Sequence, residues 1–354
     1  MNSKITYAKV GIDIDKIKSF HEIVKKLTES TLHNARGCKP ILGCGHYAAV
    51  IDIGCDKLIA LHVDGVGTKV LISQMLDKYD TIGFDLVAMH VNDLVCIGAK
   101  PIALVDYIAV EKFDKKMLID IMDGLCRAAK EAKIMIVGGE TAVMPDVIRG
   151  VDGKGYDLSG MSIGILDGEQ IITGEKIVPG DIIIGLESSG IHSNGLTLAR
   201  KVLLEKAGFK VHDVIPELGH SIGEELLKPT HIYSNVILDV LNKVPVKGLA
   251  HITGGAFTKL RRLNNKVGFD LRRMPKPPAI FKLIQEYGNI DTCEMYRTFN
   301  MGIGFCIIVD SSHSRRIVDT CAMNGVRAYI IGKVTSKKGV ISVKNEEMKS
   351  PVTI

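Results

Sequence analysis

Three carboxylates in the first half of the chain have neighbours suited to phosphate and metal chemistry. The first lies in ALHVDGVGTKV, residues 60–70, where an apolar run gives way to polar and glycine residues. The candidate ligand residues there are Asp64, Gly65, Gly67, Thr68 and Lys69. The segment lacks the Gly-Lys-Ser/Thr ending of a P-loop, and taken alone it favours an ordinary strand-to-helix turn.

The second carboxylate belongs to a helix expected over residues 81–97. Asp85, Asn92 and Asp93 interrupt this otherwise apolar sequence at spacings that put all three on one helix face. An unpaired carboxylate in a core is costly, so Asp93 is expected to be solvated or to bind a positive group. The alternative is an exposed polar stripe on an amphipathic helix.

The third carboxylate is Glu140, in IMIVGGETAVMP. We expect an apolar strand over residues 134–137 to end at Gly138 and Gly139, with Glu140 and Thr141 following. Glycine-rich strand ends expose backbone amides and hold ligands in many α/β proteins. Glu140 could instead cap a turn.

A shared metal site explains the three carboxylates better than three unrelated turns. Magnesium takes oxygen ligands, usually one or two carboxylates together with nucleotide phosphates and water. We therefore predict that Asp64, Asp93 and Glu140 face Mg²⁺, and that Lys69 offers a point charge to a phosphate. The hypothesis requires the three carboxyl groups to converge in space.

Two loops in the second half resemble anion sites at helix N-termini. GLESSGIHSNGLTLAR and HITGGAFTKL each lead from a strand through glycines and hydroxyls into a helix. The residues predicted to bind a substrate phosphate are Ser189, Gly190, Ser193, Asn194, Thr253, Gly254 and Gly255. His192 adds a titratable group, although a lone histidine in a turn is more often a hydrogen-bonding residue. In MYRTFNMGIGF, Arg297, Thr298 and Asn300 fit an ordinary strand entry.

The elements that must position these residues form two halves of mixed α/β type. At 354 residues the chain exceeds one typical core, and DGEQIITGEKIVPGD, residues 167–181, reads as a connection. We place the boundary near residue 170, giving domains 1–169 and 170–354. Expected strands alternate with expected helices along the chain. The strands are expected at residues 48–53, 58–63, 102–110, 157–166, 182–186, 249–252, 302–309 and 328–334. The helices are expected at residues 81–97, 114–133, 194–207, 221–227, 232–241 and 312–323, with a further helix from about 257.

Composition narrows the class of protein. The net charge of +5 is spread along the chain without a basic block, which argues against nucleic acid as a partner. The eight cysteines never form a C-x-x-C pair, and the chain shows neither a leader-like apolar segment nor a membrane-length apolar run. These features predict a cytoplasmic protein without membrane contact.

Six separated motifs together closely resemble the phosphoribosylformylglycinamidine cyclo-ligase (aminoimidazole ribonucleotide synthetase) family. They are DGVGTK at 64–69, VNDL at 91–94, GGETA at 138–142, SSGIHSNG at 188–195, TGGAF at 253–257 and YRTFNMGIG at 296–304. The opening YAKVGIDID also matches, and it places Lys25 at the position of a lysine of the family's N-terminal segment.

The resemblance implies a two-domain α+β fold whose N-terminal domains pair into a β-barrel across a homodimer. It also implies that formylglycinamidine ribonucleotide and ATP yield aminoimidazole ribonucleotide, ADP and phosphate, with Mg²⁺ required. His192 and Lys25 are then the expected catalytic residues, His192 moving a proton or donating to the amide oxygen and Lys25 holding phosphate. The expected ATP-binding residues are Gly43, Gly45, Asp64, Gly65, Gly67, Thr68, Lys69, Asn92, Asp93, Gly138, Gly139 and Thr141.

Two positions depart from the family pattern. Ala256 replaces the third glycine of the usual TGGGF, and the loop PILGCGHYAAV, residues 40–50, has fewer glycines than usual. One rival reading is a selenophosphate synthetase or a thiamine-monophosphate kinase, which would use a different acceptor. Two others are a hydrogenase-maturation relative and a non-catalytic nucleotide-binding subunit. Cys38 precedes Lys39 without the surroundings of a selenophosphate synthetase, and the C-terminus SPVTI lacks the terminal cysteine of the hydrogenase-maturation protein.

Overall fold

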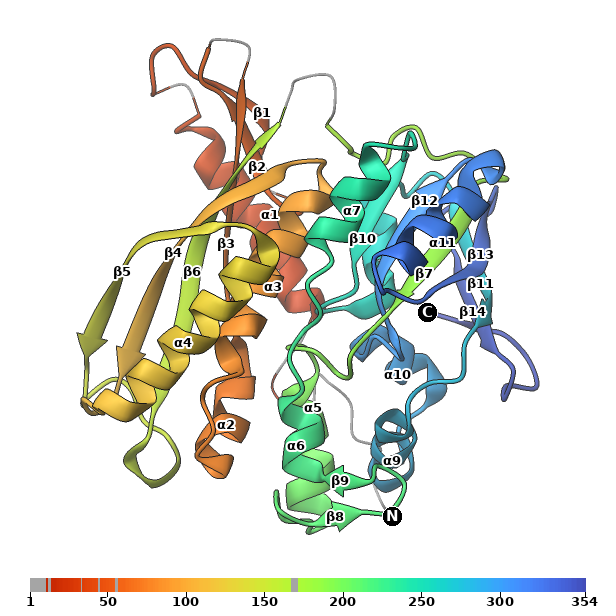
Figure 1. Ribbon diagram of the computed structural model, residues 1–354. Helices are drawn as coiled ribbons and strands as arrows, with labels where there is room; N and C mark the ends of the chain where they lie inside the picture. The colour runs from red at the N-terminus through yellow and green to blue at the C-terminus, as the bar shows by residue number, and fades with distance from the viewer. Residues whose placement is uncertain (1–10, 12–13, 33, 44, 55–56, 167–170) are drawn as a thin grey trace.

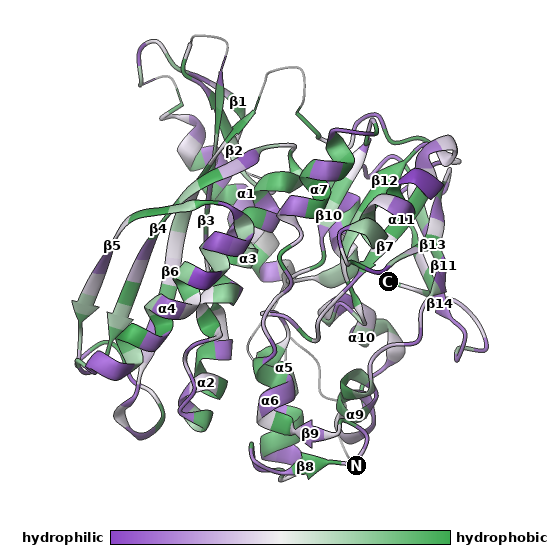
Figure 2. Cartoon of the chain, viewed as in Figure 1, coloured by the Kyte–Doolittle hydropathy of each residue, from purple (hydrophilic) through white to green (hydrophobic). Residues whose placement is uncertain are grey.

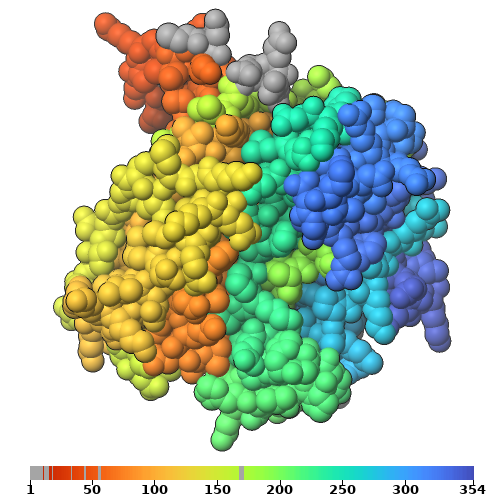
Figure 3. All heavy atoms as spheres, in the orientation of Figure 1, coloured from red at the N-terminus to blue at the C-terminus, as the bar shows by residue number. Residues whose placement is uncertain are grey.

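Two β-sheets, one in each half of the chain, form the framework of the protein (Figure 1). The computed structural model describes residues 11, 14–32, 34–43, 45–54, 57–166 and 171–354. In the space-filling view the two halves form adjoining lobes that meet along a seam (Figure 3). The mixed α/β class expected from the sequence is confirmed.

The first sheet has six strands in the order β1-β2-β3-β6-β4-β5, and only β4 and β5 pair in parallel. Its strands are β1 (Lys39–Leu42), β2 (Ala49–Asp52), β3 (Leu58–Gly65), β4 (Lys100–Val110), β5 (Met135–Val143) and β6 (Tyr156–Leu166). The helices of this half are α1 (Ile14–Glu29), η2 (Gly67–Lys69), α2 (Val70–Leu76), α3 (Ile82–Cys96), α4 (Lys115–Ala132) and η3 (Val151–Gly153).

Helix α3 packs against the central strands β3, β6 and β4 and is buried along nearly its whole length. Helix α4 lies beside α3 and is amphipathic, with Asp114 capping its first turn by accepting a hydrogen bond from the Met117 amide at 3.1 Å. The opposite face of the sheet is left open, and apolar side chains stand on it. In the hydropathy view, apolar residues are spread along β4 (Figure 2).

The second sheet has seven strands in the order β10-β12-β7-β13-β11-β14-β15. Its strands are β7 (Ile182–Glu187), β10 (Gly248–His251), β11 (Gly268–Met274), β12 (Ile303–Val309), β13 (Ala328–Thr335), β14 (Ile341–Asn345) and β15 (Val352–Thr353), while β8 (Val214–Ile215) and β9 (His220–Ser221) form a separate ribbon. Strand β12 is buried at every residue, which explains its uninterrupted apolar sequence.

Short helices surround this second sheet. They are α5 (Leu196–Arg200), η5 (Lys201–Lys206), α6 (Ile222–Leu227), α7 (Ser234–Leu241), η6 (Ala256–Lys259), α8 (Leu260–Leu263), α9 (Ala279–Gly288), α10 (Thr292–Thr298), η7 (Ser311–His313) and α11 (Ser314–Met323). Helix α3 of the first half contacts β10 and α7 of the second, so it lies at the seam between the halves.

The proposed domain boundary near residue 170 falls between the last strand of the first sheet, β6, and the first strand of the second, β7. Residues 167–170 themselves lie outside the described residues, so the exact division between 1–169 and 170–354 stays a proposal.

One local expectation about the GGETA motif was wrong. Strand β5 does not end at Val137 but continues through the glycines to Val143. Gly139 pairs with Asp106 of β4, and a β-carbon on Gly139 would lie 2.5 Å from a carboxylate oxygen of Asp106. Glycine is required there because the Asp106 side chain lies against the backbone, not because the chain turns.

Candidate active site

The carboxylate of Asp93 is held between two histidines that come from different halves of the chain. Its Oδ1 lies 2.7 Å from Nδ1 of His251, at the end of β10, and its Oδ2 lies 3.4 Å from Nε2 of His62 on β3. Burial raises the pKa of Asp93, but the hydrogen bonds from His251 and His62 outweigh it and hold that pKa well below its usual range. Asp93 is therefore a buried carboxylate that remains ionised.

Asp64 lies close to Asp93, near the end of β3. Its Oδ1 accepts a hydrogen bond from the Gly65 amide at 2.7 Å. Burial, followed by the negative charge of Asp93, raises the pKa of Asp64. Two carboxylates thus share one electrostatic environment at the seam, and a cation there would relieve their repulsion.

Glu140 does not join this pair within one chain. Strand pairing aligns Asp64 with Gly160, Asp106 and Gly139, so these residues share one face of the sheet. Glu140 is the next residue and takes the opposite, open face, where its carboxylate accepts a hydrogen bond from the Thr141 amide. Among the described residues, no group of three His, Cys, Asp or Glu side chains is placed to hold a metal ion. The convergence of Asp64, Asp93 and Glu140 required by the sequence hypothesis is absent from the single chain.

The side chain of Lys69 is enclosed by other parts of the chain and does not face an open site. Its ammonium is fully buried, donates to Asp85 Oδ1 at 2.7 Å and also donates to the carbonyl oxygen of Lys228. The same Asp85 oxygen accepts hydrogen bonds from the amide and hydroxyl of Thr230 and from the hydroxyl of Ser193. The expected point charge for a phosphate is here part of a buried network that ties the two halves together.

Asn92 also joins the halves. Its Oδ1 accepts from the Tyr233 amide at 2.7 Å, and its Nδ2 donates to the His231 carbonyl at 2.9 Å. Asp85, Asn92 and Asp93 are all buried, so the alternative of an exposed polar stripe is wrong. Each of the three is directed at a partner in the second half of the chain.

The loop that contains His192 is held in a fixed shape. His192 is buried with a φ of +66°, and its Nε2 accepts a hydrogen bond from the Ser189 amide at 3.2 Å. Burial lowers the pKa of His192 well below its usual value, and the charge of His251 adds to this. Asn300 donates to the carbonyls of Gly190 and Ile191, so this residue of the YRTFN motif positions the loop.

The two predicted phosphate loops meet in space. A β-carbon on Gly254 would lie 3.1 Å from Oδ1 of Asn194, which brings the TGG segment against the SNG segment. The hydroxyls of Ser189 and Ser193 are directed elsewhere, to the Pro229 carbonyl and to Asp85. The surfaces left for an anion come mainly from Asn194, Gly254 and their backbone neighbours.

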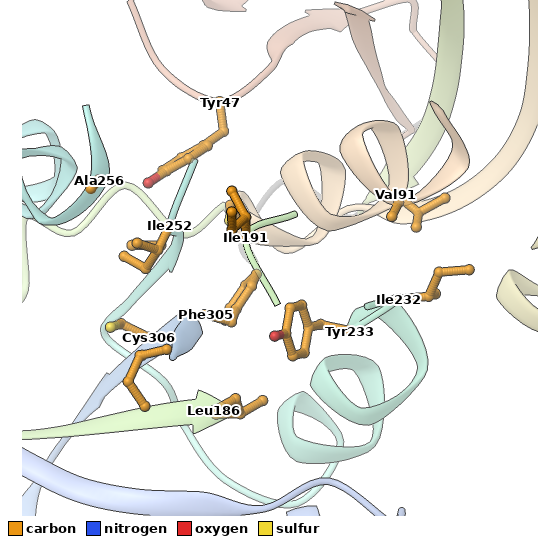
Figure 4. Packing of buried hydrophobic residues seen from close by; sticks show 14 of the residues in the cluster. Tyr47, Val91, Leu186, Ile191, Ile232, Tyr233, Ile252, Ala256, Phe305 and Cys306 are labelled. Carbon is orange, nitrogen blue, oxygen red and sulfur yellow. The ribbon is translucent and has the colours of Figure 1, made fainter. Parts of the chain in front are cut away.

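Ala256 takes a backbone conformation that favours glycine. Its φ is +44°, directly after Gly255 at +81°. The methyl group is fully buried, and the hydroxyl end of Tyr47 points toward it (Figure 4). Alanine at this φ is strained, which accounts for the glycine expected there from the family pattern.

Several residues expected at the nucleotide lie on the outside or at turns. Lys25 is exposed on α1, and Gly43 and Gly45 are exposed between β1 and β2. Thr68 Oγ1 is 2.9 Å from Thr197 Oγ1 across the seam. The structure gives no contact between Lys25, Gly43 or Gly45 and the Asp64–Asp93 pair, so their assignment stays a prediction.

Sequence reasoning missed three side chains of the site, namely His62, Tyr47 and Lys259. His62 alternates with Asp64 along β3, a spacing that would have placed both on one face. Tyr47 is buried, and the ammonium of Lys259 and guanidinium of Arg262 lie 5.4 and 5.2 Å from its ring centre. Lys259 follows the TGGAF motif closely enough that its position could have been considered.

Comparisons with known proteins show the family to which the chain belongs. Residues 45–166 match the family described as AIR synthase related protein, N-terminal domain, and residues 178–344 match the AIR synthase related protein, C-terminal domain. A relative from Methanobrevibacter smithii, named phosphoribosylformylglycinamidine cyclo-ligase, is 47% identical over 97% of this chain and 98% of its own length. A relative of the same name from Methanocaldococcus jannaschii is 45% identical over 93% and 92%. The chain belongs to the phosphoribosylformylglycinamidine cyclo-ligase family.

Solved structures share the fold at low sequence identity. The structure titled AaThiL complexed with AMPPCP and TMP has a TM-score of 0.63 at 15% identity, covering 96% of this chain and 98% of that chain. A thiamine-monophosphate kinase from Stenotrophomonas maltophilia K279a has a TM-score of 0.61 at 16% identity, covering 92% and 95%. Likeness at this level of identity establishes the fold alone.

Proposed function

We propose that the protein catalyses the ATP-dependent closure of formylglycinamidine ribonucleotide to 5-aminoimidazole ribonucleotide, a step of purine synthesis. Membership of the cyclo-ligase family supports this activity over phosphorylation of another acceptor. The observation in the structure that carries the proposal is the ionised Asp93 beside Asp64, at the seam where two glycine-rich loops meet. Such a site can hold a nucleotide and a phosphorylated substrate against each other.

The reaction needs a leaving group in place of an amide oxygen. The formamide oxygen attacks the γ-phosphorus of ATP, the bond from that phosphorus to the ADP oxygen breaks, and ADP leaves with the bonding electrons. An amidine nitrogen then attacks the same carbon, and the carbon–oxygen bond breaks to release phosphate, with loss of one proton. Because both reacting ends belong to one molecule, orientation supplies much of the rate, roughly 7–11 kcal/mol in favourable cases.

His192 is the residue proposed to handle a proton in this sequence. Its pKa is depressed, so the ring is neutral near pH 7 and its Nδ1 has no partner among the described residues. Because Nε2 accepts a hydrogen bond from the Ser189 amide, the neutral ring carries its proton on Nδ1, from which it can donate to the substrate. Lys25 remains a proposed phosphate ligand that would have to reach the site from α1.

Magnesium is proposed to enter with the nucleotide. Both oxygens of Asp93 already have histidine partners, and one oxygen of Asp64 accepts a backbone hydrogen bond. This donor set fits a cation that keeps phosphate and water ligands and takes one or two carboxylates, not a cage made by the protein alone. Asp64 and Asp93 would hold it, and the ion would neutralise charge on the transferred phosphoryl group.

A homodimer is proposed through the open face of the first sheet. Val63, Met161 and Val105 pair across three neighbouring strands, and their exposed fractions are 75%, 38% and 37%. Apolar residues lined up on an uncovered sheet face are typical of an interface. Pairing of two such faces would build the barrel that the family resemblance implies.

We propose that the protein is located in the cytoplasm. No helix in the described part of the chain is long and apolar enough to cross a membrane. Six of the cysteines are described, and all six are free thiols, which supports a reducing compartment such as the cytoplasm.

One assay tests the function. Purified protein is mixed with ATP, Mg²⁺ and formylglycinamidine ribonucleotide, and ADP and aminoimidazole ribonucleotide are measured by chromatography. The proposal expects both products in equal amounts and no ADP above background without the substrate. ADP formed with thiamine monophosphate or selenide instead would favour the rival acceptors, and ATP binding without turnover would favour a non-catalytic subunit.

A further inference from the structure

We propose that Lys259 is a catalytic residue, whose ammonium binds an oxygen of the phosphoryl group as it passes from ATP to the formamide oxygen. The inference rests on the proposed function for the identity of the acceptor, but its structural basis is independent of it. That basis is the position of Lys259 between the TGG loop, the two carboxylates and a buried tyrosine.

The contacts of Lys259 place its charge inside the site. Its ammonium donates to the hydroxyl of Thr253 in the TGG loop and lies 5.4 Å from the ring centre of Tyr47. Asp93 and Asp64 act on it as nearby negative charges that favour its charged form. Lys259 is therefore anchored by one neutral hydroxyl and one aromatic face, within the electrostatic influence of the acidic pair.

The charge of Lys259 is not neutralised by an ion pair. None of the ion pairs between described residues includes Lys259, and its one side-chain hydrogen bond is to a neutral group. Lys69 is the opposite case, because its ammonium is already bound to Asp85 and to a backbone carbonyl. Of these two lysines, Lys259 is the one with hydrogen-bonding capacity left for a phosphate oxygen.

A structural role alone gives a poor account of this arrangement. Burial lowers the pKa of Lys259, so holding the ammonium in this position costs free energy that Thr253 and Tyr47 recover only in part. An incoming phosphoryl group carries negative charge to the same place and would offset that cost. In a water-poor site such a cation stabilises the charge that develops during transfer.

The proposal fixes the step at which Lys259 acts. As the formamide oxygen bonds to the γ-phosphorus and the bond to the ADP oxygen breaks, negative charge is shared over the phosphoryl oxygens. The ammonium donates a hydrogen bond to one of these oxygens and keeps its proton throughout. An interaction that is stronger in the transition state than in the ground state raises kcat. Its loss therefore lowers kcat and leaves KM nearly unchanged.

The kinetic test compares Lys259→Met with Arg262→Met, which removes the other cation beside the Tyr47 ring. We expect Lys259→Met to lower kcat by about 100-fold or more, with KM for both substrates within about threefold and no loss of melting temperature. Arg262→Met should keep kcat within about threefold. A folded Lys259→Met enzyme with unchanged kcat, or one in which KM rises and kcat does not fall, would overturn the proposal. Lys259→Gln serves in the same way if the methionine variant does not fold.

A binding test separates this inference from the acceptor assignment. ADP with aluminium fluoride mimics a phosphoryl group in flight, and calorimetry measures its affinity without any acceptor. The wild-type protein should bind ADP more tightly when aluminium fluoride is present, and Lys259→Met should lose that gain while binding ADP alone normally. Retention of the full gain by the variant would refute the role of Lys259. Absence of turnover with formylglycinamidine ribonucleotide in the wild type would instead refute the proposed function.

Discussion

Asp93 and His251 are 158 residues apart in sequence, yet the carboxylate of one lies 2.7 Å from Nδ1 of the other. This contact joins helix α3 of the first half to strand β10 of the second. The ionised state of the carboxylate thus depends on the two halves being docked. A site assembled in this way depends on residues from both halves of the chain.

Replacing Asp93 with Asn keeps the shape of the side chain and removes its charge. We expect kcat to fall by about 100-fold or more, because the variant loses the anion that would hold a magnesium ion beside the phosphoryl group. The histidine partners can still bond to the amide, so the melting temperature should fall by only a few degrees. Steady-state kinetics and thermal unfolding measure the two effects.

His251→Gln is the matched variant for this prediction, because it keeps a donor near Asp93 without the ring. Its kcat should lie between those of the wild type and Asp93→Asn. A folded Asp93→Asn protein with kcat within threefold of the wild type would show that the charge has no part in turnover.

Lys69 and Asp85 form a buried ion pair whose stability can be measured. Both side chains are fully buried, and Lys69→Met leaves Asp85 without its cation. Removing one partner of a buried pair typically costs about 3–5 kcal/mol of unfolding free energy. The loss should appear in urea unfolding of the full-length protein.

The control for Lys69 is Lys243→Met, which breaks a partly exposed pair with Asp239 at 2.9 Å. A pair of this kind contributes at most about 1 kcal/mol. The double variant Lys69→Met/Asp85→Asn should be less destabilised than the sum of its single variants. Equal losses for Lys69→Met and Lys243→Met would contradict the structural role assigned to Lys69.

The elements were largely predictable because their patterns are local. Helix α3 and strand β12 have long apolar sequences, and their observed bounds differ from the expected ones by at most one residue at each end. Strand β11 and helices α9 and α10, between residues 264 and 300, were not predicted. That stretch mixes charged residues and prolines with short apolar runs, so its periodicity is weak.

The roles of the charged residues near the glycine motifs were less predictable than the elements. Whether Lys69 is free or paired depends on Asp85 and on the Lys228 carbonyl, which is 159 positions away. The face on which Glu140 lies depends on strand β5 continuing past two glycines, for which the sequence carries no local signal. Both outcomes are set by tertiary contacts.

His90 predicts a pH dependence of stability. Its pKa is lowered to about 3, mainly by burial and then by the charge of His62, so the ring is neutral in the folded protein. An unfolded histidine binds a proton below about pH 6.5. The contribution of the neutral His90 ring to the unfolding free energy is therefore complete above pH 6.5. It is lost as the pH falls toward 3, at about 1.4 kcal/mol per pH unit.

The His90→Gln variant should reduce the slope of unfolding free energy against pH between pH 6 and pH 4.5, by up to about 1.4 kcal/mol per pH unit. Urea unfolding at a series of pH values measures this slope. Other buried histidines keep part of the slope in the variant. The exposed His21→Gln is the control and should leave the curve unchanged. A His90→Gln curve parallel to that of the wild type would show that His90 is not the group that titrates.

The open face of the first sheet predicts how the dimer can be broken. Val63 is 75% exposed at one end of a row with Met161 and Val105, so a lysine there would place a charge in the proposed interface. Sedimentation should give the wild type about twice the chain mass of 38.5 kDa, and Val63→Lys the mass of one chain. Met323→Lys is the control, since Met323 is 73% exposed on α11 in the other half and should leave the dimer intact. A monomeric wild type would end the dimer proposal, and a dimeric Val63→Lys/Val105→Lys double variant would move the interface to another surface.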